Sequence, residues 1–410
     1  MINYAYGNTT ISGCVIDVDL KARKSLAGIL QWPDDTAHIT INDCVVKGYF
    51  HATDNEEGGT IRTISGFIAH KHRDAACTLN NCLYLGTNNT IKRKSSSTFC
   101  SEMNEGTGFT RINNCYYLNT CGKAQGTQIT EKQLKNGEVA KMLQAGRTDQ
   151  CYWAQPLGEE PNPYREAGKA EVNYVYYNKE NNGWVCDDFR LTDDKPLPIG
   201  LDFTAANVTY ERKFNGTQNA TLCLPYDLYA QGFKAYTLSG GNKNEVHFKE
   251  VDDNLTAYTP YYITANGMPQ LGGRNIEVKA YKADKMTTPA AGYKFTGTVA
   301  GVSNATAAAA NAYILQDDGK FHKVTTDYSA ATIPAYRAYI ICPPQASGAK
   351  QLSVVLDGET TGIGGVTNGR ADGPVYDLQG RRVADRLDDA ACHRLPAGVY
   401  IVGGRKVVVK

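Results

Sequence analysis

Two carboxylates near the start of the chain are the first residues that could do chemistry. Asp17 and Asp19 alternate with Val18 and Leu20, so in a β-strand both acidic side chains would face the same side. Polysaccharide hydrolases use such carboxylate pairs as acid, base or nucleophile. The competing interpretation is a solvated strand face, and it is favoured because no second acidic pair follows at an equivalent position.

The densest polar cluster is the segment from His70 to Asp74. His70 and His72 would point the same way in a strand, a spacing that can bind zinc or copper. Arg73, together with His70, Asp17 and Asp19, would form a catalytic set if the fold brought all four into one groove. Spacing fixes no third metal ligand, and an exposed turn is the competing interpretation. We expect no cofactor.

Four cysteines end a short motif that is written four times in the first third of the chain. Cys14, Cys44, Cys82 and Cys115 lie 30, 38 and 33 residues apart. A period of this length is typical of repeat arrays, in which equivalent positions stack about 4.8 Å apart. We therefore expect a buried structural ladder of free thiols, with disulfides or a bound metal as alternatives. No C-x-x-C pair supports a metal.

Short strands in stacked coils are the elements that must position these residues. The Gly-to-Cys distance is 16 residues in two copies, Gly28 to Cys44 and Gly66 to Cys82, and residues 97–100 hold the same place in the fourth copy. Each coil therefore contains at least two strands. The Asn and Gly residues before each cysteine tolerate a positive φ and suit the corners. Asn side chains stacked there can hydrogen-bond along the array.

Composition limits the class of protein. The chain has 410 residues, a formal net charge of +1 and 21% charged residues, so nothing points to nucleic acid as a partner. No run of 18 apolar residues predicts a transmembrane segment. Recurrent Thr, Val, Asn and Gly favour an all-β chain with many turns.

The order of the patterns predicts an all-β fold in four segments. A capping box at Thr130 opens one amphipathic helix over residues 130–145, and residues 173–186 form a hairpin that turns at residues 181–183. The segments are a right-handed β-helix or solenoid of repeats (1–128), a capping helix and connector (129–200), a β-sandwich (201–360), and a linker with a small C-terminal β module (361–410).

Aromatic residues offer a further possible surface. Tyr174, Tyr176, Tyr177 and Trp184 could stack on sugar rings, as could the tyrosines between residues 258 and 262. Strand aromatics of a sandwich also form its core, and that interpretation is favoured.

Three segments together resemble a known class of protein. The Gly-Phe-Ile and Asn-Cys elements of the repeats resemble the GLUG-type β-helical repeats of secreted and surface proteins of Bacteroidetes. Residues 203–226 resemble an all-β module that often follows such arrays. The stretch from Val375 to Val383, with residues 395–402 and 406–410, is similar to type IX secretion C-terminal sorting domains.

This resemblance implies an exported protein at the cell surface or cell outer membrane, whose tail is read by the export machinery. The segment before the first repeat lacks the pattern of a signal peptide, so we expect an N-terminally truncated chain. The leading hypothesis is a non-enzymatic, adhesin-like protein that presents its repeats to glycans or to host and matrix proteins. The alternatives are a β-helix polysaccharide lyase or hydrolase, and a structural stalk or surface-layer component.

Overall fold

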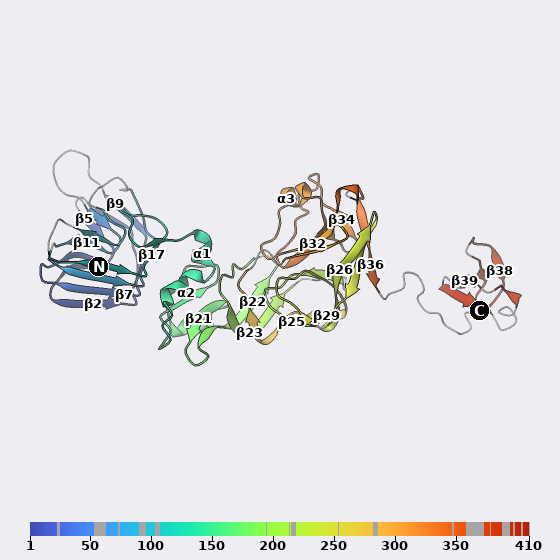
Figure 1. The fold of residues 1–410 in the computed structure, drawn as a ribbon, viewed down its shortest axis with the longest axis horizontal. Helices are drawn as coiled ribbons and strands as arrows, with labels where there is room; N and C mark the ends of the chain where they lie inside the picture. The colour runs from blue at the N-terminus through green and yellow to red at the C-terminus, as the bar shows by residue number, and fades with distance from the viewer. Residues whose placement is uncertain are drawn as a thin grey trace.

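The fold is all-β, and its few helices are short (Figure 1). The chain is known from a computed structural model. The structure describes residues 1–22, 25–52, 63–72, 74–89, 96–102, 107–193, 195–212, 214, 219–252, 254–281, 286–346, 348–357, 373–377, 379–387, 394–396, 398–402 and 405–409.

Parallel strands from successive repeats stack on one another in the first segment. Thr10 pairs with Thr40, Thr40 with Thr78, and Thr78 with Arg111, so the four motif copies lie in register. This register confirms the repeat predicted from the cysteine spacing. The buried apolar side chains of all copies form one continuous core.

Five parallel stacks make up this repeat region (blue to cyan in Figure 1). Their strands, in the order in which they pair, are β1 (Ile2–Ala5), β6 (Leu30–Pro33), β11 (Ile68–Lys71) and β15 (Cys100–Glu102); β10 (Thr63–Ser65) and β5 (Ser25–Ala27); β16 (Thr110–Asn113), β12 (Ala76–Asn80), β7 (His38–Asn42) and β2 (Asn8–Ser12); β18 (Thr127–Gln128), β17 (Tyr116–Tyr117), β13 (Leu83–Tyr84), β8 (Val45–Lys47) and β3 (Val15–Asp17); and β14 (Thr87–Asn88), β9 (Tyr49–Ala52) and β4 (Leu20–Ala22).

Glycine is required where two repeats approach most closely. Gly28 donates its backbone N–H to the carbonyl of Gly66 at 3.0 Å, and Gly66 donates in turn to Thr98 at 3.1 Å. A Cβ atom on Gly66 would lie 2.2 Å from the Thr98 carbonyl oxygen and 2.5 Å from the Tyr84 ring. The sequence pattern of Gly before an apolar strand therefore marks a contact between adjacent backbones.

Each repeat turns a corner at the residue before its motif cysteine. These four residues, which we call the corner column, are Gly13, Asp43, Asn81 and Asn114, with φ values of 66°, 51°, 52° and 51°. The prediction that Asn and Gly occupy left-handed corners is confirmed. Asp43 is the exception in residue type, because an acidic side chain occupies a place otherwise filled by Gly or Asn.

Two helices close the end of the repeat region. Thr130 caps α1 (Glu131–Lys135) through the predicted capping box with Gln133. The prediction of one helix over residues 130–145 is wrong, because Gly137 has a φ of 92° and separates α1 from α2 (Glu138–Gln144). Leu134, Val139 and Leu143 still face one way. They pack against apolar residues of the repeats in a second core.

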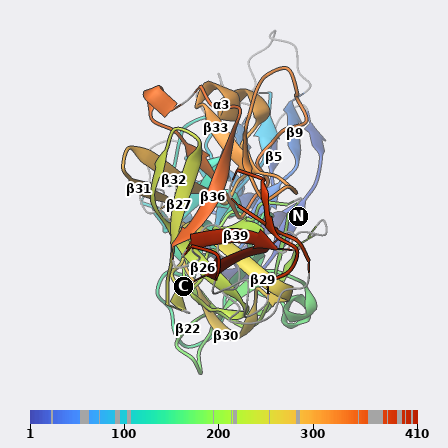
Figure 2. The same ribbon diagram turned by 90° about the vertical axis from the view of Figure 1, so that its right-hand side faces the viewer.

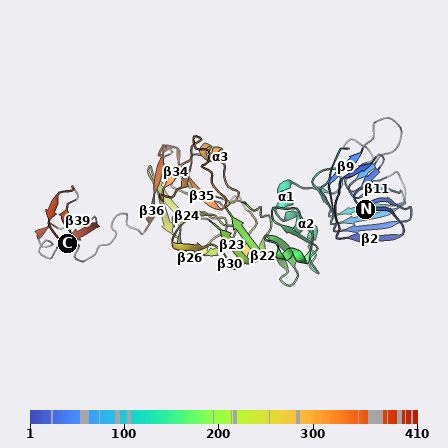
Figure 3. The same ribbon diagram turned by 180° about the vertical axis from the view of Figure 1, so that it is seen from behind.

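A six-stranded sheet follows the helices and runs across residue 200, the expected domain boundary. The predicted hairpin is confirmed, with Asn182 at a φ of 48° in its turn. The view from behind shows β22, β23 and β30 side by side (Figure 3). In pairing order the strands are β20 (Asn162–Pro163), β19 (Trp153–Pro156), β21 (Tyr174–Asn178), β22 (Gly183–Thr192), β23 (Phe203–Glu211) and β30 (Gly273–Val278), with the 3-10 turn η1 (Glu166–Ala170) between β20 and β21.

A ten-stranded sheet packs against the six-stranded one through a shared apolar core that includes Phe189, Phe203, Leu222 and Ile263. Figure 2 shows β22 and β30 on one side and β32, β33 and β36 on the other. The strands pair in the order β24 (Asn219–Leu222), β29 (Tyr261–Gln270), β26 (Gln231–Asn242), β27 (Glu245–Glu250), β36 (Gln351–Asp357), β34 (Phe321–Lys323), β33 (Ala312–Leu315), β35 (Arg337–Ile341), β32 (Tyr293–Thr298) and β31 (Thr287–Ala290); the ribbon β25 (Leu228–Tyr229) and β28 (Asn254–Leu255), the helix α3 (Asn304–Ala309) and the 3-10 turn η3 (Pro344–Ala346) complete it.

The C-terminal segment forms a separate antiparallel sheet with its own small core of Val375, Leu387, Tyr400 and Val402. Asp377 shapes its first turn by accepting hydrogen bonds from the backbone N–H groups of residues 379 and 381. In pairing order the strands are β38 (Arg382–Ala384), β37 (Val375–Tyr376), β39 (Gly398–Val402) and β40 (Arg405–Val409).

Candidate functional site

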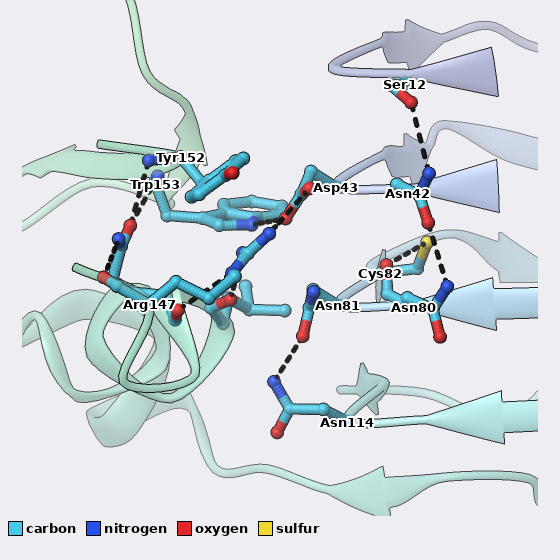
Figure 4. Close-up of polar contacts among 12 residues, drawn as sticks. Ser12, Asn42, Asp43, Asn80, Asn81, Cys82, Asn114, Arg147, Tyr152 and Trp153 are labelled. Carbon is cyan, nitrogen blue, oxygen red and sulfur yellow. Dashed lines mark hydrogen bonds and ion pairs between the residues drawn. The ribbon is translucent and has the colours of Figure 1, made fainter. Parts of the chain in front are cut away.

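A line of amide side chains runs across the repeats and forms the first wall of a candidate site. Asn113 donates to Asn80 at 2.9 Å, Asn80 donates to Asn42 at 2.8 Å, and Asn42 donates to the Ser12 hydroxyl at 3.3 Å. We call these four residues the amide ladder; Figure 4 shows three of them, Ser12, Asn42 and Asn80. The prediction of hydrogen-bonded Asn was made for the corners, where Asn114 donates to Asn81 at 2.8 Å; the ladder repeats this kind of bond one residue earlier, in the strands.

The amide ladder keeps hydrogen-bonding capacity for a ligand. A primary amide has two N–H donors and a carbonyl oxygen with two lone pairs. Asn42 and Asn80 each use one N–H and one lone pair within the ladder. Both side chains are partly exposed, and Asn113 is exposed. The ladder therefore presents a row of donors and acceptors, repeated at the strand spacing of about 4.8 Å.

Asp43 of the adjacent corner column anchors the second wall. Its carboxylate accepts hydrogen bonds from the Arg147 guanidinium, Nη1 to Oδ2 at 3.0 Å and Nη2 to Oδ1 at 2.6 Å. The indole Nε1 of buried Trp153 donates to Oδ1 at 2.8 Å. Asp43 itself is only 6% exposed. A buried carboxylate needs such partners, because an unpaired charge in the interior is strongly unfavourable.

Arg147 is held from several sides, so the second wall is fixed. Its Nε donates to the Gln144 carbonyl at 3.0 Å, and its Nη2 donates to the Leu143 carbonyl at 2.9 Å. The guanidinium lies 3.7 Å from the centre of the Tyr152 ring, which is cation–π distance. The buried Gln144 side chain accepts from the backbone N–H groups of Tyr152 and Trp153 at 2.9 and 3.3 Å. Figure 4 shows this network beside the corner column.

Asn114 makes the corresponding contact in the last repeat. Its Nδ2 donates to Asn81 at 2.8 Å and to the carbonyl of Met142, near the end of α2, also at 2.8 Å. The corner column thus docks the helical cap at two levels, through Asp43 and through Asn114.

The two walls enclose an open groove of about 700 Å³. Tyr164, which directly follows β20, lines the groove together with Tyr152. Burial, and then the hydrogen bond to Glu166, raises the pKa of Tyr164 to about 12, so its hydroxyl is neutral at physiological pH. The groove is lined by Ser12, Gly13, Asn42, Asp43, Asn80, Asn81, Asn113, Arg147, Gln150, Cys151, Tyr152, Pro163 and Tyr164.

The motif cysteines lie behind the amide ladder, on the core side. Cys44, Cys82 and Cys115 are buried and Cys14, in the first repeat, is partly exposed; all four are free thiols. Each buried thiol contacts a backbone carbonyl of the preceding repeat, for example Cys82 and the Ile41 carbonyl at 3.6 Å. Burial raises the pKa of the Cys44 thiol to about 12, which keeps it uncharged and unreactive.

The first predicted carboxylates lie away from this groove. Asp17 is exposed and forms an ion pair with Lys47 at 3.4 Å, which also pairs with Glu160 at 3.4 Å. Burial alone would lower the pKa of Lys47, but the carboxylates of Glu160 and Asp17 raise it. Asp19 accepts a hydrogen bond from the backbone N–H of Tyr49 at 2.9 Å. Neither acidic residue lines the groove.

The histidine cluster is only partly described. Arg73 and the side chain of His70 lie outside the described residues. His72 is half-exposed, and its Nδ1 contacts the carboxylate of Asp35. Within the described ranges, no group of three His, Cys, Asp or Glu side chains is close enough to hold a metal ion.

The aromatic residues considered as sugar platforms are mostly core residues. Tyr174, Tyr176 and Tyr177 are 3 to 7% exposed, and Tyr258 and the two tyrosines after Pro260 are equally buried. Trp184 is partly buried and packs edge-on against Tyr177. Their rings are therefore already covered by protein.

Sequence reasoning missed the residues of the second wall, Arg147, Tyr152, Trp153 and Tyr164. They lie in a segment without periodicity, about 100 residues from the repeats that they contact. One signal was available: Asp43 breaks the Gly and Asn pattern of the corner column, and a buried acidic corner requires a cation elsewhere in the chain.

Comparison with known proteins finds no family model that matches the chain, and no matching curated protein or solved structure. In the part of the chain that the structure describes, no helix has the length and apolar character needed to cross a membrane.

Proposed function

We propose that this chain belongs to an exported or cell-surface, adhesin-like protein, and that the repeat region is a right-handed β-helix that binds glycans. The observation that carries the proposal is the groove in which an amide ladder faces Tyr152, Tyr164 and Arg147. A host or matrix glycoprotein would be bound through its glycans at the same place.

The chemistry of the first wall suits a sugar chain. Hydroxyl groups both donate and accept hydrogen bonds, and the ladder amides match them, because each keeps at least one free N–H and one free lone pair after its ladder bonds. Asn42, Asn80 and Asn113 offer this pair at three successive repeats. A periodic ligand such as a polysaccharide can contact several repeats at once, which multiplies weak contacts into useful affinity.

The second wall supplies aromatic rings that carry hydroxyl groups at their ends. Tyr152 and Tyr164 are partly exposed, and aromatic rings of this kind pack against the C–H faces of sugars. The one described carboxylate that lines the groove, Asp43, is engaged by Arg147 and Trp153. A fully engaged carboxylate favours binding over acid–base catalysis.

A glycan array tests this proposal. We expect the wild-type chain to bind a defined set of glycans without releasing products. Binding should fall at least tenfold in Tyr164→Ala and in Asn80→Leu. The two packed sheets, six-stranded and ten-stranded, with the β25–β28 ribbon are here called the sandwich domain. Tyr229→Ala, which removes an exposed tyrosine of this domain, is the matched control and should bind as wild type. No binding to any glycan, or equal binding by Tyr164→Ala, would refute the groove as the site.

We further propose that the C-terminal module addresses export, as its resemblance to type IX sorting domains implies. Its separate small core supports a module that can be read or removed independently. Fusing residues 361–410 to a reporter in a type IX-competent host should place the reporter at the cell surface or in the medium. Retention in the periplasm would count against the proposal.

A further inference from the structure

A second cavity, of about 280 Å³, lies in the sandwich domain where strands β24, β33 and β35 meet. Two guanidinium groups line it, those of Arg212 and Arg337, together with the side chains of Gln316 and Thr332. The walls are held by Thr221, whose buried hydroxyl is hydrogen-bonded to both the N–H and the carbonyl of Ala338 at 3.0 and 2.9 Å.

Arg337 has a carboxylate partner. Its Nη2 lies 2.6 Å from Asp193 Oδ2, and the Tyr210 hydroxyl donates to Asp193 Oδ1 at 2.6 Å. Both oxygens of Asp193 are therefore occupied, one by a cation and one by a neutral hydroxyl.

Arg212 has no such partner among the described residues. Its Nη1 donates to the Thr221 carbonyl at 2.6 Å, and its guanidinium lies 4.9 Å from the Phe214 ring centre. The Nε atoms of Arg212 and Arg337 are buried, and neither has a hydrogen-bond partner in the part of the chain described. A guanidinium has five N–H donors, and among the described residues only the Nη1 of Arg212 has a hydrogen-bond acceptor.

Among the described residues, the charge around the cavity is unbalanced in favour of an anion. In that part of the chain two arginines share one inner carboxylate, Asp193, and Asp317 lies at the exposed edge of the cavity. Burial, and then repulsion from Arg337, lowers the pKa of Arg212 to about 9. Arg212 is still charged at neutral pH, and a bound anion would offset both effects.

We propose that this cavity is a binding site for a small oxyanion, either a carboxylate or a phosphate or sulfate group, held between Arg212 and Arg337. Planar guanidinium groups bind such groups through paired N–H···O contacts. Gln316 and Thr332 would contact hydroxyl groups that the same ligand carries. The site lies on the sandwich domain and does not depend on the groove of the repeat region.

Isothermal titration calorimetry of the full chain tests the site. Sodium glucuronate, inorganic phosphate and inorganic sulfate are titrated separately, each at the same ionic strength set with sodium chloride. Glucose is the neutral control. We expect saturable binding of at least one anion and none of glucose. Arg212→Gln should weaken that binding at least tenfold, and thermal unfolding of the variant checks that it is folded at the titration temperature, since it loses the bond to the Thr221 carbonyl as well as a repelled charge. Arg337→Lys keeps a cation beside Asp193 but loses the planar fork, and it should also weaken binding.

Arg190→Gln is the matched control, since Arg190 is a partly exposed arginine paired with Asp188 on the same domain. It should bind the anion as wild type does. The proposal is overturned if none of the three anions binds, if Arg212→Gln binds as tightly as wild type, or if Arg190→Gln loses binding to the same extent. Preference for glucuronate would identify a carboxylate ligand, and preference for phosphate or sulfate the corresponding ester.

Discussion

Asp43→Asn should weaken the docking of the helical cap on the repeats with little other change. The substitution leaves the backbone unstrained, because Asn81 and Asn114 already occupy the same left-handed position. It removes the charge that holds Arg147 at 2.6 and 3.0 Å and weakens the 2.8 Å bond from Trp153.

The size of the effect follows from these contacts. Removing one partner of a buried ion pair costs about 3 to 5 kcal/mol. The Arg147 side chain is 24% exposed and keeps its bonds to two backbone carbonyls. We therefore expect a loss at or below the lower end of this range, about 2 to 3 kcal/mol. Asp17→Asn breaks the exposed pair with Lys47 and should cost about 0 to 1 kcal/mol.

Urea unfolding followed by Trp153 fluorescence measures this loss, in a background where Trp32 and Trp184 are replaced by Phe. Trp153 lies in the core that joins the cap to the repeats, so its signal reports that transition. Adding Arg147→Met to Asp43→Asn closes a double-mutant cycle, and the two effects should be far from additive. The reasoning is refuted if Asp43→Asn costs no more than Asp17→Asn, or if the cycle is additive.

Three further results are expected. Gly66→Ala should destabilise the repeats by about 1 to 3 kcal/mol because its Cβ would overlap the Thr98 carbonyl, whereas Gly267→Ala, with open space around it, should change the urea midpoint little. Burial raises the pKa of Cys44 from 9.0 to about 12, so between these pH values the thiol ionises only in the unfolded chain. The free energy of unfolding should therefore be insensitive to this thiol below pH 9 and fall by about 1.4 kcal/mol per pH unit between pH 9 and 12. Comparison with Cys44→Ala isolates this contribution. Asn80→Leu should cost about 1 to 2 kcal/mol in thermal or urea unfolding by removing two ladder bonds, and an unchanged stability would show that the ladder is not formed in solution.

Local and periodic features of the fold could be predicted from the sequence. The register of the repeats, the left-handed corners and the capping box each depend on residues close together or at a fixed period, and the structure confirms all three. The break between α1 and α2 was missed because the apolar spacing of Leu134, Val139 and Leu143 continues across it. Gly137 after Asn136 was the local signal for that break.

Contacts between distant segments could not be predicted in the same way. Asp43 and Arg147 are 104 residues apart, and no period relates them. β22 and β23 pair in parallel, and residue 200 lies in the chain between them, so the expected boundary falls inside one sheet. Nothing in the local sequence indicates that the chain folds back in this way. The candidate groove is formed by two such segments, and for that reason its first wall was predictable and its second was not.

Hydrogen–deuterium exchange with and without the glycan selected by the array tests the central claim most directly. The account predicts slower exchange of the backbone at residues 110–114 and 150–164, which border the groove on its two sides, and unchanged exchange in the ten-stranded sheet. Protection confined to the ten-stranded sheet, or to the opposite face of the repeats, would contradict it.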